Sequence, residues 1–444
     1  MKKILSLLLF FGAGIFFLIL MGIIFFVYFE KDIFREKTTV NYPVPSQKSF
    51  KFQSIDTMKY SRDLSREKLD DSLFDLTIDK QIEDIAKIGA THVAIATPYD
   101  DEFLPILKRW VRSARKHNLK VWFRGNWSGW EGWFDYPRIS KEEHLSKTSK
   151  FILNNPNLFE DGDAFSSCPE CENGGPGDPR QSGDVEGYKK FLIDEYRLVN
   201  SSFSKINKEI ITNLFSMNGD VADLIMDKNT TRSLGKIVTI DHYTDTPRQL
   251  IKDADYLAKK SGGQIVLGEF GVPIPDINGK MTEKQQARWI GEMLFGLEGN
   301  QNVLGVNYWL NVGGSTGIWK EDGTATLAVE IIRRYFDLNV VYGLVYDELN
   351  NPMKNVKIEY GNRKTTTDKK GYYELKFPEK SEVNTLKFLA QGYFSQEVKL
   401  KDKVNRIDIV LAKEHKNIME KSILKVREWI SNEAWTNLLG RFKL

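Results

Sequence analysis

The sequence of 444 residues lacks three features that mark common classes of binding protein: a basic block, a Gly-rich phosphate turn and a rich supply of cysteine. Lysine and arginine total 63 against 60 acidic residues, so the electrostatic signature of a nucleic-acid-binding protein is missing and no nucleic acid is expected as a partner. No Gly-rich turn follows the first predicted strand, which argues against a doubly wound sheet that binds a dinucleotide. A neutral or weakly charged partner fits this composition better.

The only two cysteines, Cys168 and Cys171, are separated by two residues in a polar stretch that has the pattern of a loop. This C-x-x-C spacing fits a local disulfide, a redox pair or half of a metal site. No second C-x-x-C and no histidine pair completes a zinc tetrad, and a thioredoxin-like motif would open a helix after a strand. In an exported chain the spacing favours a disulfide that staples the loop.

Long uncharged runs are also rare, and the one exception stands at the N-terminus. No charged residue occurs from Ile4 to Phe29, which is long enough for a membrane helix, and Lys2 and Lys3 before it keep the N-terminus in the cytoplasm. We predict a transmembrane signal-anchor helix in residues 1–29 and a stalk in residues 30–50, with the rest of the chain outside the cytoplasm. A cleaved signal peptide is the alternative, but the run is longer than a usual signal core and no clear Ala-x-Ala site follows it.

Residues 51–339 alternate short β-rich runs with amphipathic helical patterns, which is typical of a parallel sheet built from βα units. One such helix is expected at 78–88, where apolar residues recur on a single face. The predicted strands are Asp56–Tyr60, Thr91–Thr97, Lys120–Arg124, Asp163–Ser167, Glu209–Phe215, Lys236–Asp241, Gln264–Glu269 and Val303–Trp309. Eight strands in a region of this length predict an α/β fold of the (β/α)8 TIM barrel type, whose active site lies at the C-terminal ends of the strands.

After the barrel region the pattern changes to period-two alternation with turn signals, which predicts a small β-sandwich in residues 340–412. The sequence Val341-Tyr-Gly-Leu-Val-Tyr346, the turn Asn350-Asn-Pro352 and the hairpin Thr366-Thr-Asp-Lys-Lys-Gly-Tyr-Tyr-Glu-Leu375 resemble the carboxypeptidase regulatory-like domain. Such modules are spacers or binding units. Residues 413–444 have the pattern of a basic amphipathic helix, which is expected either to dock on the protein or to lie on the membrane surface.

Acidic, basic and aromatic side chains gather at the predicted strand ends. Glu269 ends a strongly apolar run, and a buried carboxylate needs either an ion-pair partner or a chemical task. The other strand-end candidates are Arg124, Asn126 and Trp127 at strand three, Glu170, Glu172 and Asn173 at strand four, Asp241, His242 and Tyr243 at strand six, and Trp309 at strand eight. Two carboxylates on different strands with aromatic walls are what cleavage of a glycosidic bond requires.

The motifs His242-Tyr243, Gly268-Glu-Phe-Gly271 and Trp309 resemble, in order and spacing, those of clan A glycoside hydrolases, the cellulase- and mannanase-like barrels, over about residues 52–336. The resemblance implies that Glu269 is the nucleophile and that a glutamate after strand four is the acid/base. The clan has Asn-Glu there, whereas this chain has Pro169-Glu170-Cys171-Glu172-Asn173. An aromatic residue five positions earlier, Phe165, selects Glu170, with Glu172 as the alternative.

The missing strand-four amide normally bonds the 2-hydroxyl of the sugar, so Asn126 or Asn173 is expected to replace it. Tyr243 and Arg124 are expected to lower the pKa of Glu269, and the pKa of Glu170 is expected to be raised. His242 either orients a carboxylate or a substrate hydroxyl, or is structural. Trp127, Trp130 and Trp309 either stack on sugar rings or pack in the core. Arg62 and Asp63 are expected to form a structural ion pair, and the alternative is that Arg62 reaches the site.

These features together predict a membrane-anchored, extracytoplasmic retaining glycoside hydrolase or transglycosidase that acts on a β-linked polysaccharide or oligosaccharide. No metal and no organic cofactor is implied. The alternative is a non-catalytic carbohydrate-binding or cell-surface structural protein on a hydrolase-like barrel, which the absent strand-four amide motivates.

Overall fold

The computed structural model describes residues 50–175, 177–298, 300–337, 340–361, 363–376, 385–400 and 406–414. The predicted membrane helix, nearly all of the predicted stalk and most of the predicted C-terminal helix lie outside these residues. Among the described residues, no helix combines the length and the apolar composition that crossing a bilayer requires.

The larger part of the structure is built around a curled sheet of eight parallel strands, in the order β4-β3-β2-β1-β8-β7-β6-β5. The strands are β1 (Phe52–Asp56), β2 (His92–Ile95), β3 (Lys120–Phe123), β4 (Ala164–Phe165), β5 (Ser216–Asn218), β6 (Ile237–Asp241), β7 (Gln264–Phe270) and β8 (Val303–Tyr308). Backbone bonds continue from β4 to the segment before β5, where Phe165 N donates to Ile211 O at 2.9 Å and Ile211 N donates to Asp163 O at 2.8 Å. Because β1 also pairs with β8, the sheet fits a (β/α)8 barrel.

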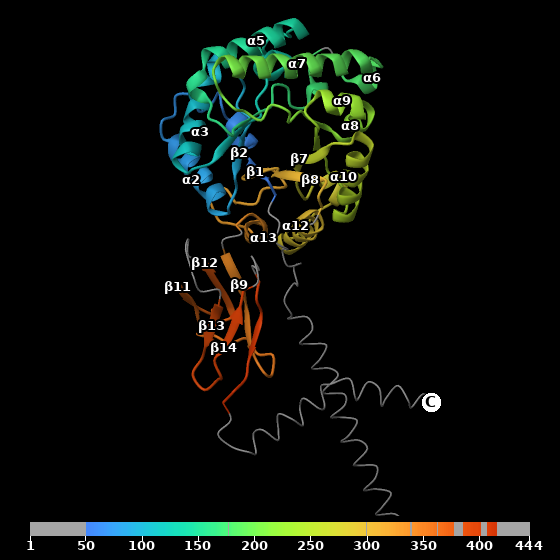
Figure 1. The fold of residues 1–444 in the computed structure, drawn as a ribbon. Coiled ribbons are helices and arrows are strands. Elements are labelled where there is room, and N and C mark those ends of the chain that lie inside the picture. Colours follow the sequence, from blue (N-terminus) through green and yellow to red (C-terminus); the bar gives the residue numbers. More distant parts are fainter. Residues whose placement is uncertain are drawn as a thin grey trace, which may run out of the picture. The chain divides into compact units, whose positions relative to one another are not determined.

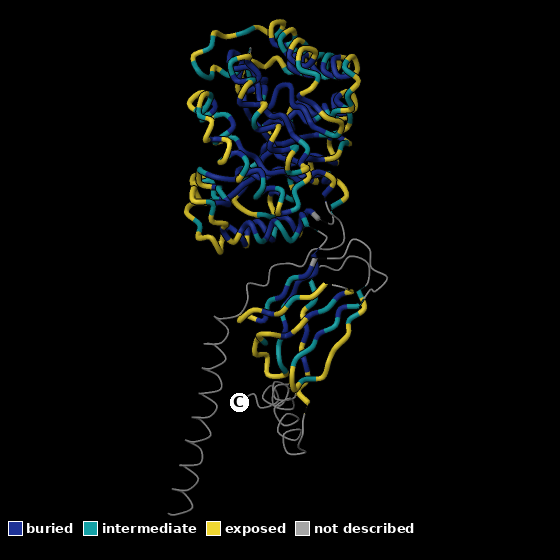
Figure 2. The backbone as a smooth tube through the Cα atoms, turned by 90° about the vertical axis from the view of Figure 1, so that its left-hand side faces the viewer, coloured by how far each residue is buried: buried dark blue, intermediate teal, exposed yellow. Residues whose placement is uncertain are grey.

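Helices surround the strands, as Figure 1 shows. They are α2 (Phe74–Lys87), α3 (Leu104–Lys116), α4 (Ser128–Glu131), α5 (Lys141–Asn154), α6 (Pro179–Ser182), α7 (Val185–Lys205), α8 (Gly219–Ile225), α9 (Lys228–Ser233), α10 (Pro247–Ser261), α11 (Pro275–Asn278), α12 (Glu283–Glu298) and α13 (Leu327–Phe336). Sequence-encoded caps set their starts: α5 begins with a capping box in which Ser140 and Glu143 bond each other's backbone N–H. The apolar faces turn inwards, so the buried backbone gathers at the strands (Figure 2).

The predicted strands differ from the observed ones at their bounds, most of all the first and the fifth. The fourth is shorter, and the fifth begins at Ser216 instead of Glu209. The first is the important correction, because the structure ends β1 at Asp56, where the prediction begins it. Gln53 is polar yet buried, since its Nε2 donates to Gly89 O and Phe336 O, and such satisfied polar residues hide the strand from a hydrophobicity pattern.

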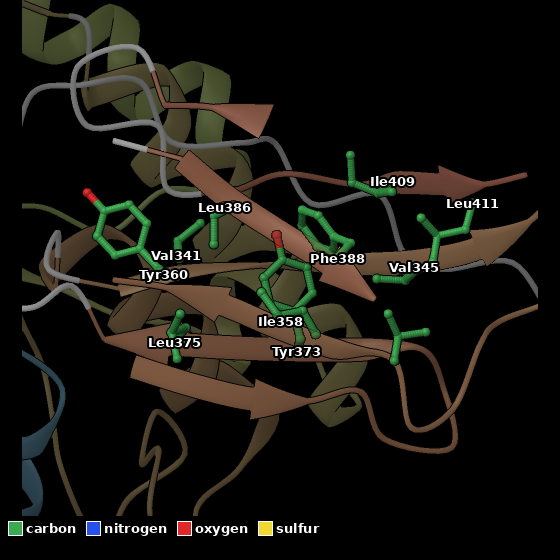
Figure 3. Close-up of a cluster of buried hydrophobic side chains, with 11 residues drawn as sticks. Val341, Val345, Ile358, Tyr360, Tyr373, Leu375, Leu386, Phe388, Ile409 and Leu411 are labelled. Carbon is green, nitrogen blue, oxygen red and sulfur yellow. The ribbon is translucent and has the colours of Figure 1, made fainter. Parts of the chain in front are cut away.

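The C-terminal described residues form two further sheets, of strand order β11-β10-β13-β14 and β12-β9-β15. Their strands are β9 (Val340–Asp347), β10 (Lys357–Tyr360), β11 (Arg363–Thr366), β12 (Tyr372–Lys376), β13 (Thr385–Leu389), β14 (Gln396–Lys399) and β15 (Ile409–Leu411). One buried cluster takes side chains from both sheets, among them Val345 of β9 and Phe388 of β13, so the two sheets share a core (Figure 3). The resemblance to a carboxypeptidase regulatory-like domain stays a prediction.

Candidate active site

Arg124, at the end of β3, is the centre of a buried ion network. Its guanidinium lies 2.9 Å from Asp56 Oδ2, 3.0 Å from Asp241 Oδ2 and 3.0 Å from Glu269 Oε1. Burial lowers the pKa of Arg124, but the attraction of the surrounding carboxylates outweighs it, and the pKa is raised. One permanent cation therefore holds together the ends of four strands, β1, β3, β6 and β7.

Glycine makes this close approach possible. A Cβ on Gly268 would lie 2.4 Å from Asp241 Oδ1, and one on Gly271 would lie 2.1 Å from Trp309 O. The carbonyl of Gly268 accepts from Arg124 Nη1 at 3.0 Å and from Asn307 Nδ2 at 2.8 Å. The Gly-Glu-Phe-Gly sequence thus serves to pack the Glu269 backbone against neighbouring strands.

Glu269 is buried and has two charge-stabilising donors. Besides the contact with Arg124, its Oε2 accepts from the Tyr243 hydroxyl at 2.7 Å. Nevertheless burial raises its pKa, with the charge of Asp56 acting in the same direction, against the opposing effects of Arg124 and Tyr243. Arg124 and Tyr243 thus lower the pKa of Glu269 as predicted, but the net shift is upwards, because the prediction did not count the cost of burial.

Glu170 lies opposite Glu269, in the loop after β4. Its backbone has φ +44°, and its N–H donates to Ser216 O at 2.8 Å. Carboxylate oxygens of Glu170, Asp241 and Glu269 lie within 4.8 Å of one another. Burial and the charge of Glu269 raise the pKa of Glu170 to about 8, in the predicted direction.

Glu172 faces away from this group. Its Oε1 accepts from Asn218 N at 2.7 Å and from Asn218 Nδ2 at 3.0 Å, while its Oε2 accepts from the Tyr188 hydroxyl at 3.1 Å. A disulfide joins Cys168 and Cys171 on either side of Glu170, with 5.1 Å between their Cα atoms. Of the two strand-four glutamates, the structure brings only Glu170 towards Glu269.

A cavity of about 290 Å³ opens beside Glu170 and Glu269. It is lined by Asp56, Met58, Arg62, Ala96, Arg124, Glu131, Trp133, Pro169, Glu170, Asn173 and Glu269. Ligand pockets of this kind commonly start at about 300 Å³, so the space suits a small group such as a single ring. Four predicted site residues line it: Arg124, Glu170, Asn173 and Glu269.

The predicted tryptophans are placed differently from one another. Trp127 is only 5% exposed, its Nε1 donates to Thr148 Oγ1, and it packs edge-on against Tyr99 and Phe151, so it is a core residue. Trp130 is likewise buried, stacked on Phe191. These two do not present a face to a sugar.

Trp309 and Trp133 remain partly exposed. Trp309 lies edge-on to Tyr243, with 5.9 Å between ring centroids. Trp133 lines the cavity, and the Arg62 guanidinium lies over its ring at 4.6 Å while pairing with Asp63 at 2.9 Å. Trp133 is therefore the aromatic residue of the cavity wall that the sequence analysis missed.

The polar residues that were predicted to bind substrate also differ in whether they line the cavity. Asn126 is fully buried, and its amide donates to Glu131 Oε1 at 2.6 Å, so Asn173 is the predicted amide that lines the cavity. The side chain of His242 bonds Asp253 of α10 at 3.0 Å, and its backbone N–H donates to Glu269 O at 2.9 Å. His242 thus orients a carboxylate, but one in a helix outside the cavity.

Sequence reasoning also missed Asp56 and Glu131. Asp56 was missed because the first strand was misplaced. Since β1 ends at Asp56, the correct strand bounds would have included Asp56 among the candidates at the strand ends. Glu131 is the last residue of α4 and follows Trp130, which the sequence analysis named as a possible sugar-stacking residue. An acidic residue beside that tryptophan was the signal that could have identified Glu131 as a site residue.

Glu170, Asp241 and Glu269 also form a possible donor set for a cation. Asp241 and Glu269 already bind the Arg124 guanidinium, whose charge would repel a metal ion at the same oxygens. The geometry therefore favours proton chemistry at these carboxylates.

No protein-family model and no curated protein matches the chain. Among solved structures, the chain is similar to GH5_18 from Streptomyces cattleya in complex with GlcNAc, at 13% identity and a TM-score of 0.50, covering 68% of this chain and 85% of that one. It is also similar to Bacteroides uniformis beta-glucuronidase 2, at 11% identity and a TM-score of 0.47, covering 82% of this chain but 46% of the other, so it spans under half of that protein. Its structural neighbours are glycoside hydrolases, and at these identities the likeness shows the fold alone.

Proposed function

We propose that the barrel is a retaining glycoside hydrolase or transglycosidase acting on a β-linked polysaccharide. The observation that carries the proposal is the pair Glu170 and Glu269, whose carboxylate oxygens lie within 4.8 Å of each other beside a cavity. Retaining enzymes hold their two carboxyl groups about 5–5.5 Å apart, whereas inverting enzymes leave room for a water molecule between them.

The environments support distinct roles. Arg124 forms an ion pair with Glu269 and Tyr243 donates a hydrogen bond to it, so Glu269 is the group that carries the negative charge and attacks the anomeric carbon. Glu170 has a pKa of about 8 and is protonated at neutral pH, so it gives its proton to the leaving oxygen. In the second step Glu170 takes a proton from water or from an acceptor hydroxyl, whose oxygen attacks the anomeric carbon and releases Glu269.

The test is cleavage of p-nitrophenyl β-glycosides and of β-glucan and β-mannan by the wild-type protein and by Glu269→Gln and Glu170→Gln. Both variants should lose activity, and azide should rescue Glu170→Ala by giving a β-glycosyl azide. Glu186→Gln is the matched control, because Glu186 is an exposed residue of α7. An azide product of inverted configuration relative to the substrate would exclude the retaining mechanism.

The alternative is a protein that binds carbohydrate without cleaving it. Pro169 lines the cavity directly before Glu170, where the clan has an amide for the sugar. Binding of a glycan with no turnover in the wild-type protein would favour this alternative.

We also propose that the protein is anchored in the cell membrane with its barrel outside the cytoplasm. The uncharged run from Ile4 to Phe29 supports an anchor, and the Cys168–Cys171 disulfide fits an oxidising compartment. Digestion of the barrel by protease added to intact cells tests this; a barrel protected until the cells are lysed contradicts it.

A further inference from the structure

Glu131 is a third glutamate of the same cavity, and the two-glutamate mechanism does not use it. Its Oε1 accepts from Asn126 Nδ2 at 2.6 Å, and among the described residues its Oε2 makes no hydrogen bond. Burial raises the pKa of Glu131 to about 7. Glu131 is partly exposed where it lines the cavity, so one of its carboxylate oxygens is held by Asn126 and the other is available to a ligand.

A buried chain of polar groups fixes the position of Glu131. Asn126 Oδ1 accepts from Trp127 N at 2.8 Å and lies 3.0 Å from His144 Nε2, which must be the donor because the amide oxygen can only accept. The Asn126 amide nitrogen is therefore directed at Glu131. On the far side, His144 Nδ1 lies 3.4 Å from Glu195 Oε1.

These polar groups link the cavity to two helices of the outer layer. His144 belongs to α5 and Glu195 to α7, and both are fully buried. The rings of Trp130 and Phe191 lie 4.6 and 5.8 Å from the His144 ring, so the polar groups are shielded from water. Such a network is costly unless its orientation of Glu131 serves a purpose.

The charges of the cavity indicate what Glu131 recognises. Arg124 is bound by three carboxylates and Arg62 by Asp63, so both cavity cations are already paired. Glu131 and Glu170 add two further carboxyl groups, of which Glu170 is protonated at neutral pH. The cavity therefore offers acceptors to a ligand, and its two cations, which are already paired, leave little positive charge to attract a ligand carboxylate.

We propose that Glu131 is a specificity-determining residue whose Oε2 accepts a hydrogen bond from a hydroxyl or amine group of the sugar, with Asn126, His144 and Glu195 as positioning residues. The cavity takes neutral or amine-bearing sugars in preference to uronic acids. This inference rests on the proposed function, since it takes the cavity to be a sugar site.

The experiment measures binding separately from cleavage. Cellohexaose, mannohexaose and chitohexaose are titrated calorimetrically into full-length Glu170→Gln protein, and the hexasaccharide that binds is used throughout. Adding Glu131→Gln, which keeps the shape of the side chain, should weaken binding about tenfold, as expected for a hydrogen bond to a charged group. Adding Glu186→Gln should leave the affinity unchanged.

The positioning role has its own readout. Asn126→Ala should weaken binding as Glu131→Gln does, and the two together should weaken it no further, because they remove one interaction. His144→Gln keeps a donor to Asn126 and should retain the affinity that His144→Ala loses. Additive losses, or equal losses in the two His144 variants, would overturn the positioning role.

The results also separate this inference from the proposed function. Unchanged affinity in Glu131→Gln, or failure of every hexasaccharide to bind, overturns the role of Glu131. Weakened binding in Glu131→Gln together with a wild-type protein that binds but never cleaves supports Glu131 and overturns the hydrolase. A p-nitrophenyl β-glucuronide that competes better than the β-glucoside would overturn the preference against uronic acids.

Discussion

Replacing Tyr243 by phenylalanine removes one of the two donors to Glu269 and little else. The hydroxyl donates to Glu269 Oε2 at 2.7 Å, while the ring lies against Trp309 and remains in Tyr243→Phe. The donor favours the ionised carboxylate, so its loss should raise the pKa of Glu269 beyond the rise that burial already causes.

The size of the effect follows from the hydrogen bond. A bond to a charged group contributes about 1.5–3 kcal/mol. Since about 1.4 kcal/mol corresponds to one pKa unit, the acidic limb of the kcat/KM profile should move upwards by about one to two pH units. Activity needs ionised Glu269, so it is lost as pH falls through the raised value.

The assay is kcat/KM against pH for the p-nitrophenyl β-glycoside that the wild-type protein cleaves best. Tyr188→Phe is the matched control, because Tyr188 is also a buried tyrosine that donates to a glutamate, but that glutamate is Glu172, which faces away from the cavity. The control should leave the acidic limb in place. An unmoved limb in Tyr243→Phe, or a limb that moves downwards, would refute the assignment of Glu269 as the ionised nucleophile.

The basic limb of the wild-type profile should lie near pH 8, because Glu170 must carry a proton and loses it as pH rises through its pKa; a limb set by Glu170 should disappear with activated substrates that need no acid. Arg124→Met should destabilise the protein by about 3–5 kcal/mol in urea unfolding, since it leaves buried carboxylates without their cation, and a loss under about 1 kcal/mol would contradict the network. Reduction of the Cys168–Cys171 disulfide should lower kcat but change Tm little, because the loop that it closes is short yet carries Glu170. Thiol titration confirms the reduction. An unchanged kcat would show that the loop keeps its shape without the disulfide.

The sequence predicted the alternation of strands and helices, and the position of Glu269 at the end of a strand, because both depend on local patterns. It misplaced β1, since Gln53 and Ser54 are buried polar residues, and Gln53 bonds Gly89 and Phe336, which lie far along the chain. That error concealed Asp56. The sense of the Glu269 pKa shift could not be read from its neighbours alone, because burial depends on the packing of the whole barrel.

The predictions that Trp127 and Asn126, after strand three, contact the sugar differ from the structure for a related reason. Trp127 and Asn126 follow Arg124 directly in sequence, but both turn into the protein, whereas Trp133 reaches the cavity from the next turn of chain. Loop conformation decides which of several neighbouring residues faces the site, and local sequence carries little information about it.

The Arg124 network has a consequence for how this barrel can change over time. Asp56, Asp241 and Glu269 each bind Arg124, so altering any of them disturbs the fold as well as the chemistry. Glu170 lies outside those ion pairs, and its loop has its own covalent closure. On the proposed mechanism, mutation of Glu170 is thus the least damaging way to abolish turnover, and a lineage that exchanged hydrolysis for glycan adhesion would be expected to lose Glu170 first while retaining Arg124 and Glu269.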